Sequence, residues 1–127
     1  MVLDWDSINY LAIIIGALVY IIYGAIYYSI LLSGEKSKQT EGAIKYIYSI
    51  IIAFISSFLV AILVQLTGAE TLLQGAIIGF IIGVIIKMVY VKNALFGLIT
   101  KKSTLIAICD HLIIFTLLGA LHGWLSY

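Results

Sequence analysis

Four long apolar stretches constrain this chain more than any other feature of its sequence. Each holds about 20 or more residues, enough for an α-helix that rises ~1.5 Å per residue to cross a hydrocarbon core of ~30 Å. Hydrophobic residues make up 64% of the 127 residues and charged residues only 10%, well outside the composition of soluble domains. The sequence therefore predicts an all-α integral membrane protein, with spans at Ile8–Leu32, Ala43–Leu66, Leu72–Val91 and Leu105–Leu125.

The spacing of these spans predicts their arrangement. Four buried helices of a soluble bundle are excluded, because no span has a continuous charged face to present to water. The connectors between the spans are short, "TGAE" being the shortest, and short connectors make neighbouring helices antiparallel. We therefore predict a single transmembrane domain over residues 1–127, an up-down antiparallel bundle of four helices.

The lysines predict the orientation of the bundle. All seven cationic residues are lysines, and they lie in or beside the first and third connectors, which places these connectors in the cytoplasm and both termini outside. Aromatic residues agree, since they gather at both ends of the spans as interfacial belts do. The outer belt would be Trp5, Tyr10, Trp124 and Tyr127, and the inner belt Tyr27, Tyr28, Tyr46, Tyr48 and Tyr90.

Composition also argues against several classes of function. A net charge of +1 gives no basic surface for nucleic acid. Cys109 is the single cysteine, so no internal disulfide is expected, and we predict it to be a small buried apolar filler. We find no catalytic constellation, no phosphate loop and no set of metal ligands. The sequence therefore predicts neither an enzyme nor a protein with a cofactor or metal.

Glycines at helical spacing predict close helix contacts. Small residues four apart let a partner backbone approach closely, which is how membrane helices gain packing contacts. Glycine is also simply common in membrane helices, but three in register within one span is a stronger pattern than a single pair. The predicted packing glycines are Gly75, Gly79 and Gly83 in the third span, Gly119 and Gly123 in the fourth, and Gly16 and Gly24 in the first.

One face of the first span carries tyrosines. Tyr20 and Tyr23 fall on the same helical stripe as Gly16 and Gly24, while the opposite face is Ile, Leu and Val and suits lipid. We expect both tyrosines to point inward, where their hydroxyls need partners. Those partners would be either other residues of the protein, which is a structural role, or a bound ligand.

Three ionisable residues fall inside the predicted spans: Lys87, Asp110 and His111. Lys87 and Asp110 are predicted at similar depth on consecutive antiparallel helices, so we expect them to pair. The pair would be structural or functional, or Lys87 would reach the headgroups alone. His111, with an ordinary pKa near neutrality, could pass protons. His122 lies close to the interface and needs no special role.

Several short segments resemble a prokaryotic membrane family catalogued as domain of unknown function 1761. They are "NYLAIIIGALVY" from Asn9, "YYS" from Tyr27, "GAETLLQGAIIG" from Gly68, "NALF" from Asn93 and "HLIIFTLLGAL" from His111. The resemblance implies a small multi-span helical protein of the prokaryotic cell membrane, without an established activity or site.

The same resemblance bears on individual residues. His111 matches the family's histidine in the last span, whereas Asp110 stands where the family has an aromatic residue. Ile30 and Ala107 also depart from the family, which often has proline and asparagine at those positions. A family-wide role for Asp110 is therefore not expected.

Two functions follow as hypotheses. The first is a protein that acts by helix packing, as a homo-oligomer or as an accessory subunit of a larger integral membrane complex, with the lipid bilayer and those chains as its partners. The second is a small proton-linked transporter or channel that uses Lys87, Asp110 and His111.

Overall fold

The computed structural model describes residues 3–32 and 42–126. The described chain forms a short 3-10 turn, η1 (Trp5–Ser7), followed by four α-helices. All four helices are long and apolar enough to cross a membrane, which confirms the predicted all-α membrane fold. They are α1 (Tyr10–Leu31), α2 (Ile44–Thr67), α3 (Leu72–Leu95) and α4 (Lys101–Trp124).

The helices extend past the apolar stretches where capping residues allow it. Helix α4 begins about one turn before the predicted span, because the Thr100 hydroxyl caps it by accepting the Ser103 N–H at 3.1 Å. Helix α3 likewise runs about one turn beyond Val91. Hydropathy therefore located the membrane-spanning part of each helix, and local capping chemistry decided where the helix starts and stops.

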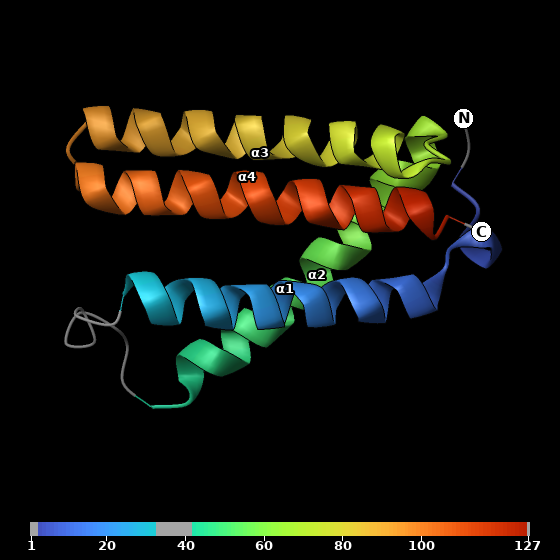
Figure 1. The fold of residues 1–127 in the computed structure, drawn as a ribbon, viewed down its shortest axis with the longest axis horizontal. Coiled ribbons are helices and arrows are strands. Elements are labelled where there is room, and N and C mark those ends of the chain that lie inside the picture. The colour runs from blue at the N-terminus through green and yellow to red at the C-terminus, as the bar shows by residue number, and fades with distance from the viewer. Residues whose placement is uncertain (1–2, 33–41, 127) are drawn as a thin grey trace.

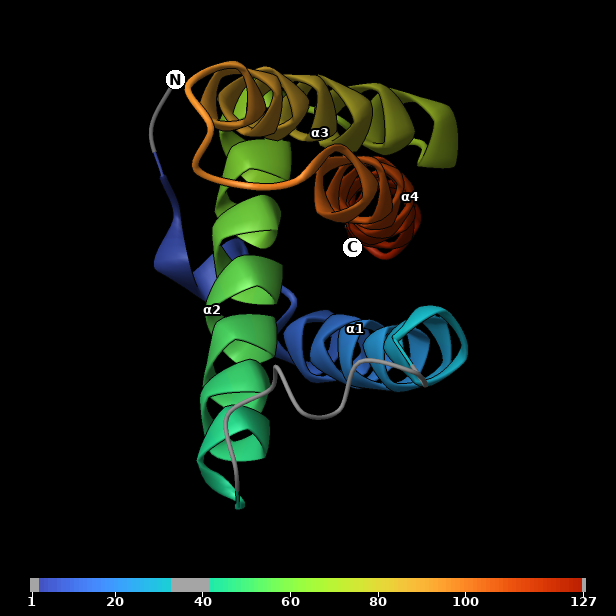
Figure 2. The same cartoon turned by 90° about the vertical axis from the view of Figure 1, so that its left-hand side faces the viewer.

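Successive helices run in opposite directions, as predicted, but α2 departs from a parallel-sided bundle. Helices α1, α3 and α4 follow the long axis of the molecule, and α2 crosses them obliquely (Figures 1 and 2). The two ends of the described chain lie together (Figure 1). We call this the terminus end, and we call the opposite end, where α1 and α3 finish and α2 and α4 begin, the lysine end. Which end faces the cytoplasm stays a prediction.

Helices α3 and α4 form the most extensive contact between any two elements. Every glycine of the α3 row faces α4. A Cβ atom added at Gly79 would meet the Phe115 carbonyl oxygen and come within 3.0 Å of the Thr116 Cα, and one at Gly83 would lie 3.0 Å from the Leu112 Cα. The two backbones therefore touch, with no side chain between them.

Helices α1 and α2 meet differently, at one crossing point in the first half of α1 and near the middle of α2. Small residues lie there: Ala12, Gly16 and Ala17 on α1 and Ala53 and Ser57 on α2 are all buried. A Cβ atom at Gly16 would collide with the Ser57 hydroxyl and lie 3.1 Å from Nε2 of His122 on α4. Three helices thus share one crossing, and α2 diverges from α1 toward the lysine end (Figure 1).

The outward faces are apolar, and several residues of the predicted aromatic belts are exposed near the helix ends. Trp5, Tyr10 and Trp124 are exposed near the terminus end, and Tyr46 and Tyr48 are exposed near the lysine end. Tyr127 and the lysines at positions 36 and 38 lie outside the described residues.

Two expectations about side-chain direction are wrong. Cys109 is exposed on the outer surface of α4, not buried, because the neighbouring Asp110 occupies the inward position. Tyr27 and Tyr28 do not join a belt, since their hydroxyls bond to α4.

Candidate functional site: a polar cavity beside α4

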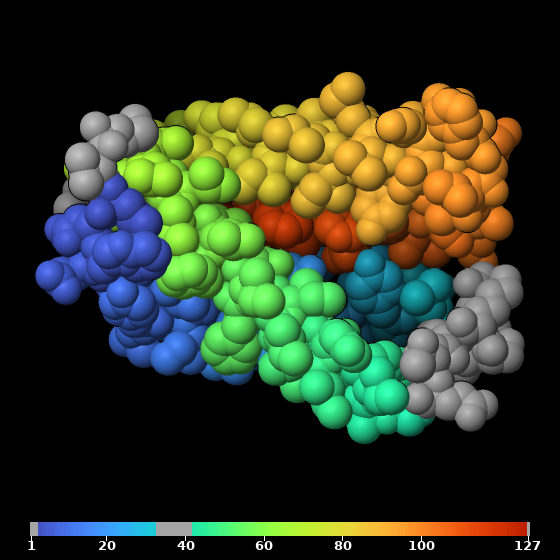
Figure 3. Space-filling view, turned by 180° about the vertical axis from the view of Figure 1, so that it is seen from behind, coloured from blue at the N-terminus to red at the C-terminus, as the bar shows by residue number. Residues whose placement is uncertain are grey.

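A cavity of about 910 Å³ lies where α2 diverges from α1 and α4. In the space-filling view of Figure 3, α2 crosses the face obliquely, and the surface is hollowed between it and the end of α1. Of its 17 lining residues, ten are polar or aromatic. Its polar and aromatic lining comprises Tyr20, Tyr23, Tyr28, Ser29, Lys45, Tyr46, Ser49, Tyr90, Asp110 and His111.

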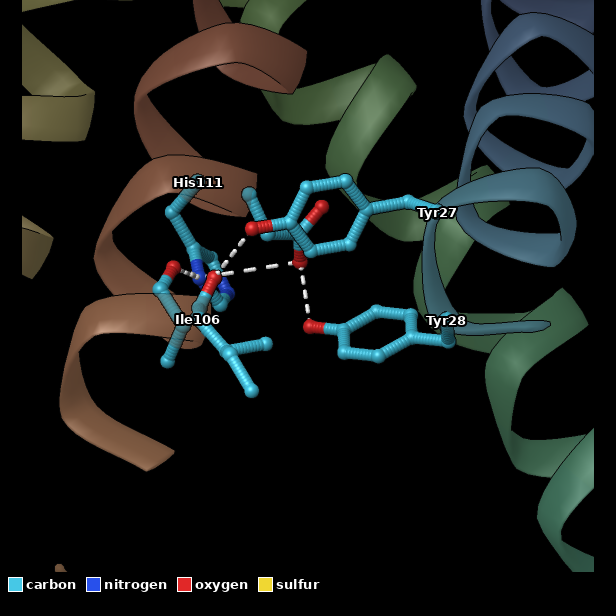
Figure 4. Close-up of polar contacts among 6 residues, drawn as sticks. Tyr27, Tyr28, Ile106 and His111 are labelled. Carbon is cyan, nitrogen blue, oxygen red and sulfur yellow. Dashed lines mark hydrogen bonds and ion pairs between the residues drawn. The ribbon is translucent and has the colours of Figure 1, made fainter. Parts of the chain in front are cut away.

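Asp110 is the buried charged group of this cavity, with 5% of its surface exposed. The Tyr28 hydroxyl of α1 donates a 2.5 Å hydrogen bond to Oδ2 of Asp110 (Figure 4). An acidic acceptor and a phenol donor form a strong, short bond of this kind. The bond holds the carboxyl group at the cavity wall and joins the end of α1 to the start of α4.

His111 lies beside Asp110, and its hydrogen bond defines its tautomer. Nδ1 of His111 lies 2.6 Å from the Ala107 carbonyl oxygen, which can only accept, so Nδ1 carries a proton. The ring packs 5.2 Å from the Tyr90 ring and 6.2 Å from the Phe115 ring, centroid to centroid. In the neutral form Nε2 is then an acceptor, and protonation there makes it a second donor.

Tyrosines of α1 complete the wall. Tyr27 donates a 2.7 Å hydrogen bond to the Ile106 carbonyl oxygen (Figure 4), and the Tyr23 ring stacks on the Tyr27 ring at 5.5 Å. The Tyr23 hydroxyl is buried, and no described residue hydrogen-bonds to it. Tyr20 packs edge-on against Phe115 of α4. The prediction that Tyr20 and Tyr23 point inward is confirmed.

Asp110 also begins a buried row on α4 with a polar group at each end. Ile114, Leu118 and His122 follow at four-residue intervals, and all four residues are buried. Ile114 and Leu118 are almost fully enclosed, at 1% and 0% exposure. They separate the polar cavity from a second polar site around His122.

That second site lies at the helix crossing. The Ser57 hydroxyl donates to the Ile13 carbonyl oxygen at 2.8 Å and lies 3.0 Å from Nε2 of His122. Because the single Ser57 proton is used on Ile13, His122 must donate from Nε2. His122 also lines a smaller cavity of about 150 Å³ toward the terminus end, together with Asn9 and Gln65.

The predicted pair of Lys87 and Asp110 is not formed. Lys87 is exposed on α3, and among the described residues the ion-pair contact of Asp110 is with Nδ1 of His111, at 3.8 Å. The direction of Asp110 on α4 explains this. Residue 110 lies two positions, or roughly 200°, from Leu112, which faces Gly83 of α3. Asp110 consequently points away from α3 and toward α1.

The glycine predictions hold in most positions. Gly75, Gly79, Gly83, Gly119 and Gly123 form the α3–α4 contact, and Gly16 lies at the crossing of α1, α2 and α4. Gly24 differs, because a Cβ atom there would meet nothing within 4 Å. It borders the cavity and packs against no other helix of the described chain.

Sequence reasoning missed Tyr28, Ser57 and Lys45 as members of interior sites. Tyr28 was predicted at the membrane interface, and Ser57 had no visible partner in the sequence. The sequence did carry one signal for an aromatic wall, because Tyr20, Tyr23 and Tyr27 fall on one face of α1. Within residues 3–32 and 42–126, no cluster of three His, Cys, Asp or Glu side chains could hold a metal ion.

These features define the chain as a small multi-pass helical membrane protein with a polar interior cavity. Residues 11–123 match the family described as protein of unknown function DUF1761, and the chain belongs to this family. The resemblance seen in the sequence segments is thereby confirmed. No curated protein and no solved structure matches the chain.

Proposed function

We propose that this protein is a small membrane carrier that binds a solute in the cavity beside α4 and links its movement to protonation of Asp110. The observation that carries this proposal is the carboxyl group of Asp110, buried at the wall of a cavity of about 910 Å³. Ionisable groups inside a membrane are costly and mark substrate or proton pathways.

The charge balance around Asp110 supports the proposal. Tyr28 supplies a neutral donor, and the basic groups nearby are His111, with Nδ1 3.8 Å from Oδ2 of Asp110, and Lys45, which lines the same cavity. A carboxylate in a poorly hydrated site requires a proton or a positive counterpart. The Asp110 carboxyl group is therefore suited to exchange, because what it binds changes when a proton or a charged solute enters the cavity.

The arrangement along α4 supports a carrier over an open channel. Ile114 and Leu118 close the path between the larger cavity and His122. Helices α1 and α2 meet at a single crossing of small residues, which suits a pivot about which the two could rock. In this proposal that rocking opens the site to one side of the membrane at a time.

Assembly is the competing function. The α3 glycines contact α4 of the same chain, so this row does not supply a surface for another subunit. A homo-oligomer or an accessory subunit would need to use the apolar outer faces instead. This role remains a prediction and is the alternative outcome of the experiment below.

The test is solute-dependent proton movement in liposomes that contain the purified full-length protein and an internal pH dye. A panel of small cationic, zwitterionic, neutral and anionic solutes is added outside, one at a time. We expect at least one class to move protons through the wild type, and Asp110→Asn to abolish the signal while Asp6→Asn, at an exposed residue of η1, retains it. Gel filtration in detergent checks that both variants fold. If no solute moves protons through the wild type, the carrier function is wrong and the assembly role is favoured.

A further inference from the structure

We infer that the solute is an organic cation, a compact ammonium with an aromatic or aliphatic body, which takes the place of a proton on Asp110. This inference rests on the proposed carrier function and adds the chemical class of its ligand. It is drawn from the charge, the aromatic wall and the unpartnered hydroxyl of the cavity.

The first argument is charge. Asp110 is the acidic residue in the cavity lining, and its hydrogen bond from Tyr28 leaves one carboxylate oxygen, Oδ1, without a hydrogen bond from any described residue. A monovalent cation satisfies that oxygen directly. An anionic solute would instead bring a second negative charge next to a buried carboxylate, which is unfavourable in a site of low dielectric.

The second argument is the aromatic wall. Tyr20, Tyr23 and Tyr28 of α1 face the cavity together with Tyr46 of α2 and Tyr90 of α3. Aromatic faces attract ammonium groups through their electron-rich rings, and groups of such rings are how proteins recognise quaternary ammonium ions. Nζ of Lys45 already lies 5.1 Å from the centroid of the Tyr46 ring, so the rings left for a solute are those of Tyr20, Tyr23, Tyr28 and Tyr90.

The third argument is the Tyr23 hydroxyl. It is buried without a partner among the described residues, which is costly unless a ligand or water completes it. Its oxygen can accept a hydrogen bond from an N–H donor of a protonated amine. Gly24 next to it leaves open space, since a Cβ atom there would touch nothing. The cavity volume lies in the range that binds drug-sized molecules.

Two basic groups also face this cavity and must be weighed. Lys45 sits with its ammonium over the Tyr46 ring, and His111 donates through Nδ1 to its own helix. A cation binds at Asp110 most favourably while His111 is neutral, because a protonated His111 would repel it. Among the described residues, the other titratable groups near Asp110 are the hydroxyls of Tyr20, Tyr23, Tyr27 and Tyr28 from α1, and Tyr90 of α3 lines the same cavity against His111.

The exchange step balances simply. The cation enters while the Asp110 carboxyl group gives up its proton to water, so one positive charge replaces another and no covalent bond forms between protein and solute. Binding should therefore release up to one proton per cation, and acid should compete with the cation. A neutral molecule of the same shape should release none.

The experiment measures binding to the full-length protein in detergent, with benzylammonium as the probe. Its neutral carbon isostere, ethylbenzene, and the anion benzenesulfonate are the controls. Calorimetry in weakly and strongly ionising buffers reports both binding and proton release. We expect the cation to bind at least about tenfold more tightly than either control, to release protons, and to weaken as the pH is lowered.

Variants sharpen this test. Asp110→Asn should abolish cation binding, whereas Asp6→Asn should leave it unchanged. If Asp110→Asn does not fold, proton release and acid competition in the wild type still decide the question. Equal binding of the neutral isostere without proton release, or no binding of the cation, would overturn the ligand class. Should the liposome assay then still show proton movement with another solute, only the ligand class fails and the carrier function stands.

Discussion

The α3–α4 contact and the α1–α2 contact both depend on small residues, but with opposite results. Between α3 and α4 the glycines repeat over the first half of α3, so the backbones touch from Gly75 near its start to Gly83 at its middle. Between α1 and α2 the small residues cluster at one crossing near Gly16 and Ser57. A repeated row produces a closed pair of helices, whereas a single cluster lets the helices diverge. The cavity and its buried carboxyl group lie on the diverging side.

This comparison predicts different responses to the same substitution, and the largest effect is expected in the closed pair. Gly79→Ala places a Cβ against the carbonyl group of Phe115 and the Cα of Thr116. Both are backbone groups of α4, so neither can rotate away from the added methyl group. We expect a loss of about 3 kcal/mol or more in stability, at the upper end for overpacking. Thermal unfolding in detergent measures it.

Gly24→Ala is the matched control, since the added methyl meets open space. It should change stability by less than about 1 kcal/mol, and helix propensity favours alanine. Equal losses from the two variants would contradict the distinction between a closed pair and a diverging one.

The next effect concerns how Asp110 is held. Tyr28→Phe removes the donor of a hydrogen bond to an acidic group, which is expected to cost about 1.5–3 kcal/mol. A double-mutant cycle of Tyr28→Phe with Asp110→Asn should show coupling of about 1 kcal/mol or more. The parallel cycle of Lys87→Met with Asp110→Asn should be additive to within about 0.5 kcal/mol, because these residues do not meet. Coupling in the Lys87 cycle alone would restore the ion pair that the sequence predicted.

These two comparisons also show how far the sequence could be read. The length of the spans and the spacing of the α3 glycines depend on one helix at a time, so both were predictable. The Lys87–Asp110 pair depended on the rotation of α4 about its own axis, which is set by the glycine contact and not by the depth of either residue. The cavity depended on the crossing of α1 and α2, which hydropathy does not encode. Tyr20 and Tyr23 were found because a stripe of one helix is visible in sequence, but Tyr28, Lys45 and Ser57 became interior residues only through the helices opposite them.

A smaller effect is expected at the crossing itself. Ser57→Ala leaves the buried Nε2 donor of His122 without its acceptor, at a cost of about 1–2 kcal/mol. Ser49→Ala on the same helix is the matched control, since Ser49 is exposed and, within the described part of the chain, its hydroxyl donates to the Lys45 carbonyl oxygen. Its stability should change by less than about 0.5 kcal/mol. If Ser57→Ala is as mild as Ser49→Ala, the crossing does not depend on this hydrogen bond.

The central claim is that the diverging side of the bundle holds a water-accessible cavity within the membrane. Ile21 lines the cavity, and its neighbour Ile22 is 58% exposed on the outer face of α1, so the two isoleucines differ in direction but hardly in depth. The measurement is the rate at which a water-soluble thiol reagent labels Ile21→Cys and Ile22→Cys in liposomes, each in a Cys109→Ala background. A thiolate forms readily only where water reaches it, so we expect Ile21→Cys to react at least about tenfold faster than Ile22→Cys. Equal rates, or faster labelling of Ile22→Cys, would contradict the cavity and the function proposed for it.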